Sequence, residues 1–403
     1  MNGIPMCLVL VGSLAAASVD AASDPDLKAV VDGNTACALD LYGRLRANPG
    51  NLFFSPHSLS TALAMTYGGA RGETEKQMAQ ALHFNLPQDR LHSSFAALDT
   101  VLHNVQKQGK VRLSIANSLW PQQDHPFRPE YLALCQRDYG VAITPVDYVA
   151  AADEARGKIN AWVEDQTQKK ITDLIVPGLL TPLTRLVLAN AIYFKGSWAS
   201  RFQAPLTQDE PFHLSADKVA AAPLMRQKGK FGCADFDDLQ VLELPYAGGD
   251  LSMLVLLPHR VDGLAELEAK LTVETLAEWM KDLREREVEV LLPRFKTTSE
   301  FSLKDALTAL GMRDAFDVLK ADFSGMDGRH WLFISAAVHK AFVDVNEEGT
   351  EAAAATGVAI AMRSVQLHSE VFRADHPFLY LIRENHTGSV LFLGRLTDPR
   401  AKK

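Results

Sequence analysis

The feature that most constrains the fold is an alanine-rich segment between two runs with strand-like patterns. Residues 336–345 and 377–382 have these patterns, and between them Gly349-Thr350-Glu351 is followed by four alanines. Alanine has the highest helix propensity, so the local sequence favours an exposed helix. With a period of two, the segment also suits a strand, because small uncharged side chains would share one face: Thr350, Ala352, Ala354, Thr356 and Val358.

The strand interpretation has a specific consequence for this segment. Glu351 would face away from the small residues, so insertion into a sheet would bury no charge. Gly349 supplies the backbone freedom that a hinge needs. Extended at about 3.3 Å per residue, the run from Thr350 to Arg363 would reach roughly 46 Å, comparable to a protein diameter.

The rest of the chain indicates one large mixed α+β domain. Residues 27–118 have a mainly helical pattern, with a further helix expected over residues 91–105. The later part alternates strand-like and helical runs. Strands are expected at 111–115, 187–194, 251–257, 288–292 and 390–393, and helices at 159–168 and 264–280.

Composition excludes several kinds of partner. Acidic and basic residues are scattered along the 403-residue chain, which has a formal charge of -8 and a pI near 5.9. No basic stripe suited to nucleic acid is present, and we expect a monomer without a nucleic-acid partner. No segment approaches the roughly 18 apolar residues that span a bilayer, so no membrane partner is expected.

The first residues suggest export. Residues 4–17 are apolar and small, and Val19-Asp20-Ala21 fits a small-x-small cleavage signal, although no Lys or Arg precedes the apolar stretch. We therefore expect a signal peptide at 1–21, a single mature domain at 22–403, and secretion to an extracellular or periplasmic location. The alternative is that residues 1–21 are a disordered tail.

The cysteines favour neither disulfides nor a metal site. Cys37, Cys135 and Cys233 would remain after removal of Cys7 with the signal peptide, and none belongs to a CxxC pair. An odd number without metal-ligand spacing argues against a disulfide framework and a zinc site. We expect buried thiols and no cofactor.

At the alanine-rich segment the sequence resembles a known family. Asn346-Glu347-Glu348-Gly349-Thr350-Glu351-Ala352-Ala353-Ala354-Ala355-Thr356 is similar to the hinge of inhibitory serpins. Further serpin-like stretches follow in order along nearly the whole chain, and together they are highly specific. They are residues 51–58, 69–74, 159–171, 188–198, 292–295, 376–378 and 392–396.

The resemblance implies a fold and a mechanism. The fold has three β-sheets surrounded by eight or nine helices, with an exposed reactive-centre loop at about residues 347–372. The implied function is inhibition rather than enzymatic catalysis. A protease serine attacks the loop, an acyl-enzyme forms, and the severed loop inserts as a new central strand, which traps the protease covalently.

Counting along the family hinge locates the bond that is attacked. With Glu347 as residue one, the seventeenth residue is Arg363, so the reactive bond would be Arg363-Ser364. A guanidinium suits a pocket with a carboxylate at its base, which predicts a trypsin-like serine protease as the partner. A shift by one residue would instead offer Met362 to a chymotrypsin- or elastase-like enzyme. Cysteine proteases are a further alternative.

The resemblance also implies three groups of functional residues. The hinge comprises Glu347, Gly349, Thr350, Ala352, Ala353, Ala354, Ala355 and Thr356. The shutter, a polar cluster under the central sheet where strands must part, comprises Ser55, Ser58, Asn190 and His339. The breach, where insertion starts, comprises Trp198, Arg294 and Glu347.

Two other functions remain open at this stage. Ser55 and His339 could belong to a hydrolase, but no GxSxG elbow surrounds Ser55 and Pro56 follows it. A non-inhibitory serpin, acting as a carrier, chaperone or storage protein, would be favoured by a bulky or charged hinge, which this chain lacks. Polyanion activation is not expected, because residues 91–109 carry few basic side chains, chiefly Lys107.

Overall fold

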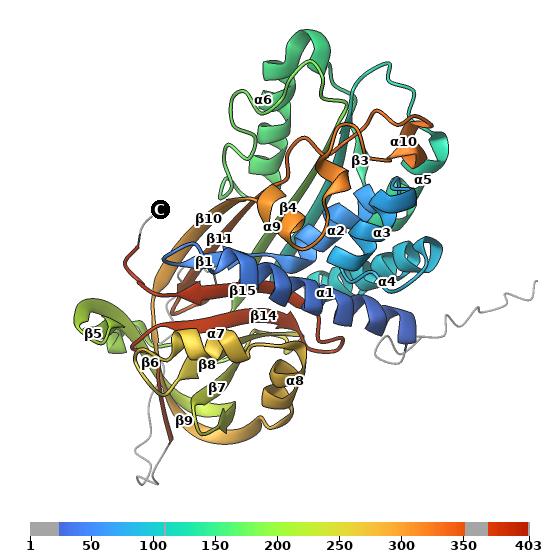
Figure 1. Ribbon diagram of the computed structural model, residues 1–403. Coiled ribbons are helices and arrows are strands. Elements are labelled where there is room, and N and C mark those ends of the chain that lie inside the picture. The colour runs from blue at the N-terminus through green and yellow to red at the C-terminus, as the bar shows by residue number, and fades with distance from the viewer. Residues whose placement is uncertain (1–23, 109, 351–369, 402–403) are drawn as a thin grey trace, which may run out of the picture.

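A computed structural model describes residues 24–108, 110–350 and 370–401, without the side chains of 114–116 and 190–191. The predicted signal peptide therefore lies outside the described residues. The described part contains ten α-helices, of which the last two are short (Figure 1). They are α1 (Pro25–Leu45), α2 (Pro56–Tyr67), α3 (Gly72–Ala81), α4 (Gln88–Lys107), α5 (Pro129–Tyr139), α6 (Tyr148–Gln166), α7 (Leu264–Lys270), α8 (Val273–Lys281), α9 (Lys304–Ala309) and α10 (Ser324–Asp327).

Capping residues explain where several helices begin and end. Asp24 accepts hydrogen bonds from the first-turn amides of α1, and Ser55 does so for α2, which has Pro56 at its first position. The single helix expected at 264–280 is two helices, because Thr272 and Thr275 form a reciprocal cap that starts α8.

Six strands form the sheet that contains the hinge, in the order β10-β11-β12-β4-β2-β3. The neighbours β4 and β2 pair antiparallel along their length. The bounds are β2 (Val111–Pro121), β3 (Ala142–Ile143), β4 (Leu186–Ser197), β10 (Phe295–Ser302), β11 (Val338–Asn346) and β12 (Gly349–Thr350).

The other nine strands form one hydrogen-bonded network with two parts, and the long strand β6 belongs to both parts. One part contains β5, β9 and β13, and the other contains β7, β8, β14, β15 and β1. Together with the six-stranded sheet, these two parts make the three predicted sheets. The bounds are β1 (Leu52–Phe54), β5 (Gln208–Ser215), β6 (Lys218–Asp235), β7 (Leu239–Pro245), β8 (Leu251–Pro258), β9 (Arg284–Pro293), β13 (Glu370–Arg373), β14 (Phe378–Glu384) and β15 (Val390–Leu396).

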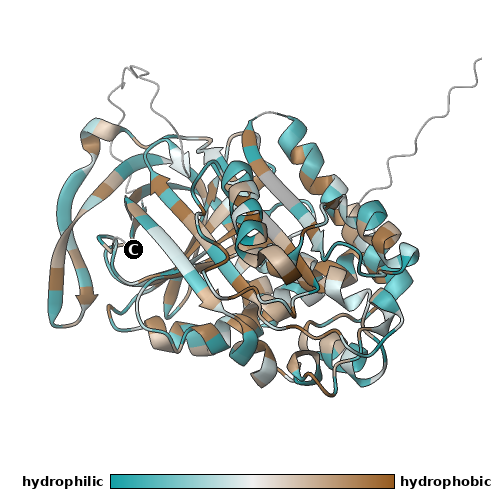
Figure 2. Cartoon of the chain, turned by 90° about the horizontal axis from the view of Figure 1, so that it is seen from above, coloured by the Kyte–Doolittle hydropathy of each residue, from teal (hydrophilic) through white to brown (hydrophobic). Residues whose placement is uncertain are grey.

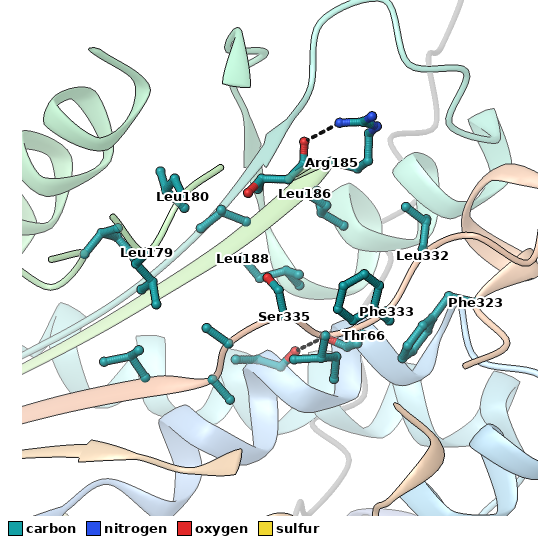
Figure 3. Close-up of a pocket in the computed structure, with 18 of the residues that line it drawn as sticks. Thr66, Leu179, Leu180, Arg185, Leu186, Leu188, Phe323, Leu332, Phe333 and Ser335 are labelled. Carbon is teal, nitrogen blue, oxygen red and sulfur yellow. Dashed lines mark hydrogen bonds between the residues drawn. The ribbon is translucent and has the colours of Figure 1, made fainter. Parts of the chain in front are cut away.

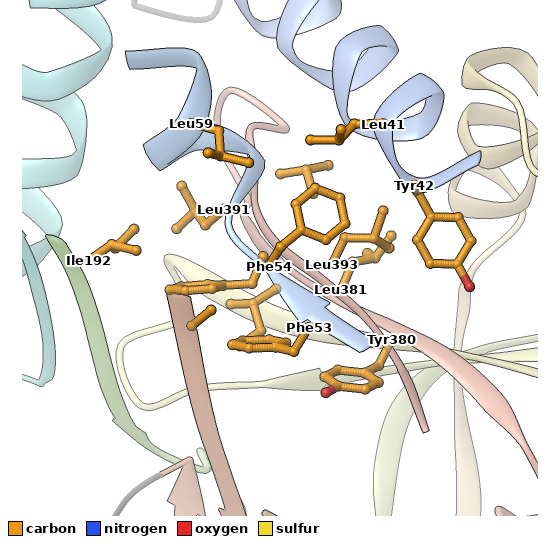
Figure 4. Close-up of a cluster of buried hydrophobic side chains, with 14 of the residues drawn as sticks. Leu41, Tyr42, Phe53, Phe54, Leu59, Ile192, Tyr380, Leu381, Leu391 and Leu393 are labelled. Carbon is orange, nitrogen blue, oxygen red and sulfur yellow. The ribbon is translucent and has the colours of Figure 1, made fainter. Parts of the chain in front are cut away.

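The core lies between the N-terminal helices and the C-terminal strands. In Figure 4, side chains of α1 and α2 meet those of β1, β14 and β15. Phe53 is stacked with Phe392, with ring centroids 5.2 Å apart. Figure 2 shows bands of alternating hydropathy along several strands. Burial alternates along much of β6, whereas β8 and β15 are buried along their whole length. Elements from the first and last parts of the chain thus form one core.

The three described cysteines are free and buried, as predicted. Burial raises the pKa of Cys37 and Cys135 to about 12 and that of Cys233 to about 11, so these thiols are poor nucleophiles. Among the described helices, none combines the length and apolar character needed to cross a bilayer.

Candidate functional site

The start of the hinge lies inside the six-stranded sheet. Gly349 and Thr350 form β12, which pairs antiparallel with β4 on one side and with β11 on the other. On the β4 side Thr350 is opposite Gly196, and on the β11 side it is opposite Val345. The two residues therefore occupy a strand position between β4 and β11.

Gly349 is required at its position by space and by backbone geometry. Its φ angle is 151°, a value that residues with a Cβ rarely adopt. A Cβ at this position would lie 1.9 Å from the carbonyl oxygen of Gly196. The close approach of β12 to β4 therefore depends on glycine.

The side chain of Thr350 is buried against the aromatic residue Tyr246. It is 2% exposed, and its hydroxyl lies 2.7 Å from that of Tyr246. The Tyr246 ring is stacked with Trp198 at 4.7 Å between centroids. A larger or charged side chain at residue 350 would have to displace this stack.

The predicted breach residues come together around the turn that precedes β12. The Trp198 indole nitrogen donates to the carbonyl of Asn346 at 2.9 Å, and the Trp198 amide donates to the carbonyl of Glu348 at 2.9 Å. Arg294 forms an ion pair with Glu347, whose carboxylate also accepts a hydrogen bond from Thr207 at 2.7 Å. Trp198 thus fixes the backbone of the turn, and Arg294 fixes its carboxylate.

The carboxylate of Glu347 remains ionised in this setting. Burial raises the pKa of Glu347, but hydrogen bonds from Arg294 and Thr207 outweigh burial and hold the pKa below its ordinary value. The ion pair of Glu347 with Arg294, here called the Glu347 latch, therefore joins the hinge to the neighbouring elements at neutral pH.

Three contacts at this site were missed from the sequence. Thr207 and Tyr246 bind hinge side chains, and Arg201 forms an ion pair with Glu348 at 2.7 Å. Each lies more than a hundred residues from its partner in the chain, and no local pattern signals such a contact.

The predicted shutter residues lie where α2 begins beneath the sheet. The Ser55 amide donates to Nε2 of His339 at 3.0 Å, and the Ser55 hydroxyl donates to the carbonyl of Leu391 at 2.7 Å. The Ser58 amide in turn donates to the Ser55 hydroxyl. Asn190 lies on β4 opposite Asn117 of β2, and its side chain is outside the described residues. Burial lowers the pKa of His339 to about 4, so it is neutral at pH 7.

This geometry does not suit a serine hydrolase. His339 accepts the hydrogen bond of a backbone amide, so its free nitrogen does not face the Ser55 hydroxyl. That hydroxyl donates to a carbonyl instead. A nucleophile needs a base within hydrogen-bond reach of its own proton, and Ser55 is not arranged in this way with His339.

The remaining hinge residues and the reactive bond lie outside the described residues. Ala352–Ala355, Thr356 and the Arg363-Ser364 bond all belong to the segment 351–369. Beyond it the chain forms β13, which pairs parallel with β9 from Glu370 onward. Residues 370–372, the end of the expected reactive-centre loop, are the first three residues of this strand.

Residues 32–399 match the family model described as Serpin (serine protease inhibitor). The chain belongs to the serpin family. Uncleaved ovalbumin, a solved serpin-like structure, superposes with a TM-score of 0.82 at 34% identity, covering 92% of this chain and 100% of ovalbumin. The predicted α+β serpin fold is confirmed, and with it membership of a family described as serine protease inhibitors.

Two curated relatives indicate which proteases such serpins inhibit. The leukocyte elastase inhibitor A of Mus musculus is 46% identical over 377 residues, covering 91% of this chain and 98% of the relative. The leukocyte elastase inhibitor of Bos taurus is 47% identical with the same coverage. Both relatives are named for an elastase.

These relatives correct two predictions. The predicted trypsin-like specificity is wrong, because it rested on a count to Arg363 and the matched serpins are elastase inhibitors. The predicted secretion is overturned by the same comparison with leukocyte elastase inhibitors, which align with 91% of this chain.

Proposed function

We propose that this serpin is a suicide-substrate inhibitor of elastase-like and chymotrypsin-like serine proteases. The observation that carries the proposal is the position of β12, where the first hinge residues already lie between β4 and β11. A strand that continues from Thr350 in the same direction would extend the sheet without further rearrangement of the hinge. The elastase inhibitors among the relatives support the choice of target.

The register of β12 supports insertion of the residues that follow. Because Thr350 is opposite Gly196 and Val345, each further residue would move one position along β4 and β11. Glu351 would then lie between Lys195 of β4 and Asp344 of β11, and Asp344 already forms an ion pair with Lys296. Ala354 would lie between Ile192 and Ala341, two buried residues that leave room for a small side chain.

The same register connects the hinge with the shutter. Thr356 would lie opposite Asn190 of β4 and His339 of β11. A hydroxyl can donate and accept, so it could join the polar cluster at the point where it enters the sheet. The shutter residues would then serve both the uncleaved and the inserted sheet.

Elastase- and chymotrypsin-like pockets accept apolar side chains, so we place the attacked bond at Met362-Arg363. The protease serine oxygen would bond to the Met362 carbonyl carbon, the Met362-Arg363 bond would break, and the proton would pass to the new amine of Arg363. The protease would remain joined to Met362 as an ester. Arg363-Ser364 is the competing bond in the same loop.

The domain from residue 22 onward would act as one inhibitory unit. Incubation with an elastase or a chymotrypsin should give an adduct that survives SDS, and a C-terminal fragment whose mass begins at Arg363. Complete turnover of the chain as a substrate, without an adduct, would contradict the proposal. A fragment that begins at Ser364 would agree with the inhibitory mechanism but would show that the cleaved bond is Arg363-Ser364.

A further inference from the structure

A cavity of about 260 Å³ lies between α2, the loop before β4 and the segment before β11. Its walls are predominantly apolar, as the close-up in Figure 3 shows. Leu63 of α2, Leu180 of the loop and Phe333 of the segment before β11 represent the three sides. The hydroxyls of Thr66 and Thr184 are engaged with backbone atoms of their own segments, so they leave the wall apolar.

The cavity coincides with the path of insertion. Continued from Thr350, the β12 register sets Val358 to Ile360 opposite Leu188 to Leu186, which line the cavity. On the other side it sets Gly357 opposite Val338, which also lines the cavity. Any molecule that fills this space would occupy the position of the last residues to enter the sheet.

The cavity opening has two features of a ligand site. Leu183 and Trp331, which line the cavity, are 76% and 70% exposed, whereas most large apolar side chains of the described chain are buried. Arg185 lies at one end, and two of its hydrogen bonds go to carbonyls of its own loop. Among the described residues, no carboxylate forms an ion pair with Arg185, so its charge is available to an anion.

We propose that this cavity binds an amphiphilic carboxylic acid, with its alkyl chain against the apolar walls and its carboxylate at Arg185. The regulatory part of this inference rests on the proposed function. A bound acid would block the entry of residues 357–360 and would convert the inhibitor into a substrate. Insertion would then stop after about seven residues, counted from Thr350 in the register above.

Direct binding tests the site without any protease. The full chain should bind a dansyl-labelled undecanoic acid with a blue shift of emission, and dodecanoate below its micelle concentration should displace the probe. Ala62→Phe, which fills the cavity from α2, should weaken binding about tenfold or more. Leu183→Glu changes an exposed residue, so the fold is retained, and its carboxylate should also weaken binding. Equal affinity of all three chains would overturn the site.

The charge of the ligand is tested separately. Arg185→Gln should weaken binding of dodecanoate about fivefold and leave binding of dodecanol unchanged, since one exposed ion pair contributes about 1 kcal/mol. Arg44→Gln, an exposed arginine of α1, is the matched control and should change neither. Equal loss for the acid and the alcohol would overturn the carboxylate assignment.

Competition with insertion is measured by the number of serpin molecules consumed per elastase molecule inhibited. Saturating dodecanoate should raise this number for the wild-type chain and leave it unchanged in Leu183→Glu, which weakens binding at the opening without filling the cavity. Binding of dodecanoate with an unchanged number would overturn the competition. Absence of inhibition before any acid is added would instead refute the proposed function, while the binding measurement would still test the cavity.

Discussion

Single residues at the hinge have requirements that only the structure reveals. The sequence suggested Gly349 as a source of flexibility, whereas its role in the structure is to let β12 approach β4 closely. The predicted breach pair of Arg294 and Glu347 could be placed from the family pattern, and the structure brings the two together. Thr207 and Tyr246 could not be predicted, because a hydroxyl that binds a distant partner has no local signature.

Gly349→Ala should impair inhibition. The new Cβ would meet the Gly196 carbonyl, and relief of this clash would move the hinge out of its strand position at a strain of about 1–3 kcal/mol. The yield of SDS-stable complex with elastase should fall, with more cleaved chain released. Gly157→Ala is the matched control, because nothing surrounds a Cβ there. An unchanged complex yield in Gly349→Ala would contradict the role of β12.

The Glu347 latch predicts a pH dependence. Because the pKa of Glu347 is lowered in the folded chain, its stabilisation is present above the ordinary pKa of 4.5 and is lost as pH falls through the lowered value. Glu347→Gln should therefore reduce the thermal midpoint at pH 7, by the equivalent of about 1.5–3 kcal/mol for hydrogen bonds to a charged group. The difference from wild type should vanish in strong acid. A difference that is constant from pH 7 to pH 3 would exclude an ionic latch.

The lowered pKa of His339 predicts that the stability of the folded chain depends on pH in a second range. Its folded pKa of about 4 lies below the ordinary 6.5, so the unfolded chain binds the proton more tightly between these values. The shutter should lose stability as pH falls from 6.5 to 4, and His339→Gln should flatten this part of the urea-midpoint profile. Retention of the full slope in His339→Gln would assign the effect to other groups.

At the scale of elements, the neighbouring strands determine the conformation of Gly349 and Thr350. The four alanines favour a helix when considered alone, yet β12 begins a strand between β4 and β11 directly before them. Long helices with strong periodicity were predicted well, as α4 illustrates. The division of 264–280 into α7 and α8 was missed because the Thr272 cap outweighs continuous apolar periodicity.

Thr350→Arg should convert the inhibitor into a substrate. Residue 350 is 2% exposed and contacts the Tyr246 hydroxyl, so arginine would either bury an unpaired charge or leave the sheet. Elastase should then cleave the chain with little complex formed. Thr350→Ser retains the hydroxyl and the small volume, and it should form complex as wild type does. Equal complex yields from the arginine and serine variants would refute the strand assignment of the hinge.

At the scale of the whole molecule, the order of motifs was enough to predict the fold but not the target. The hinge, breach and shutter motifs are distributed along nearly the whole chain, and the fold brings them together along the line between β4 and β11 (Figure 1). Protease specificity depends on one or two residues of the loop, so a shift of one position from Arg363 to Met362 changes the predicted partner. The matched relatives are named as inhibitors of an elastase, which supports the proposed choice of Met362.

The central claim is that the loop after Thr350 is lower in free energy inside the sheet than outside it. Insertion of about ten residues with hydrogen bonds on both sides would add about 10 kcal/mol, which corresponds to roughly 10 °C in a chain of this size. The direct test is the thermal midpoint of the full chain before and after a non-target protease cuts within 351–369. We expect a rise of at least this size after cleavage; a midpoint that stays the same or falls would contradict the account.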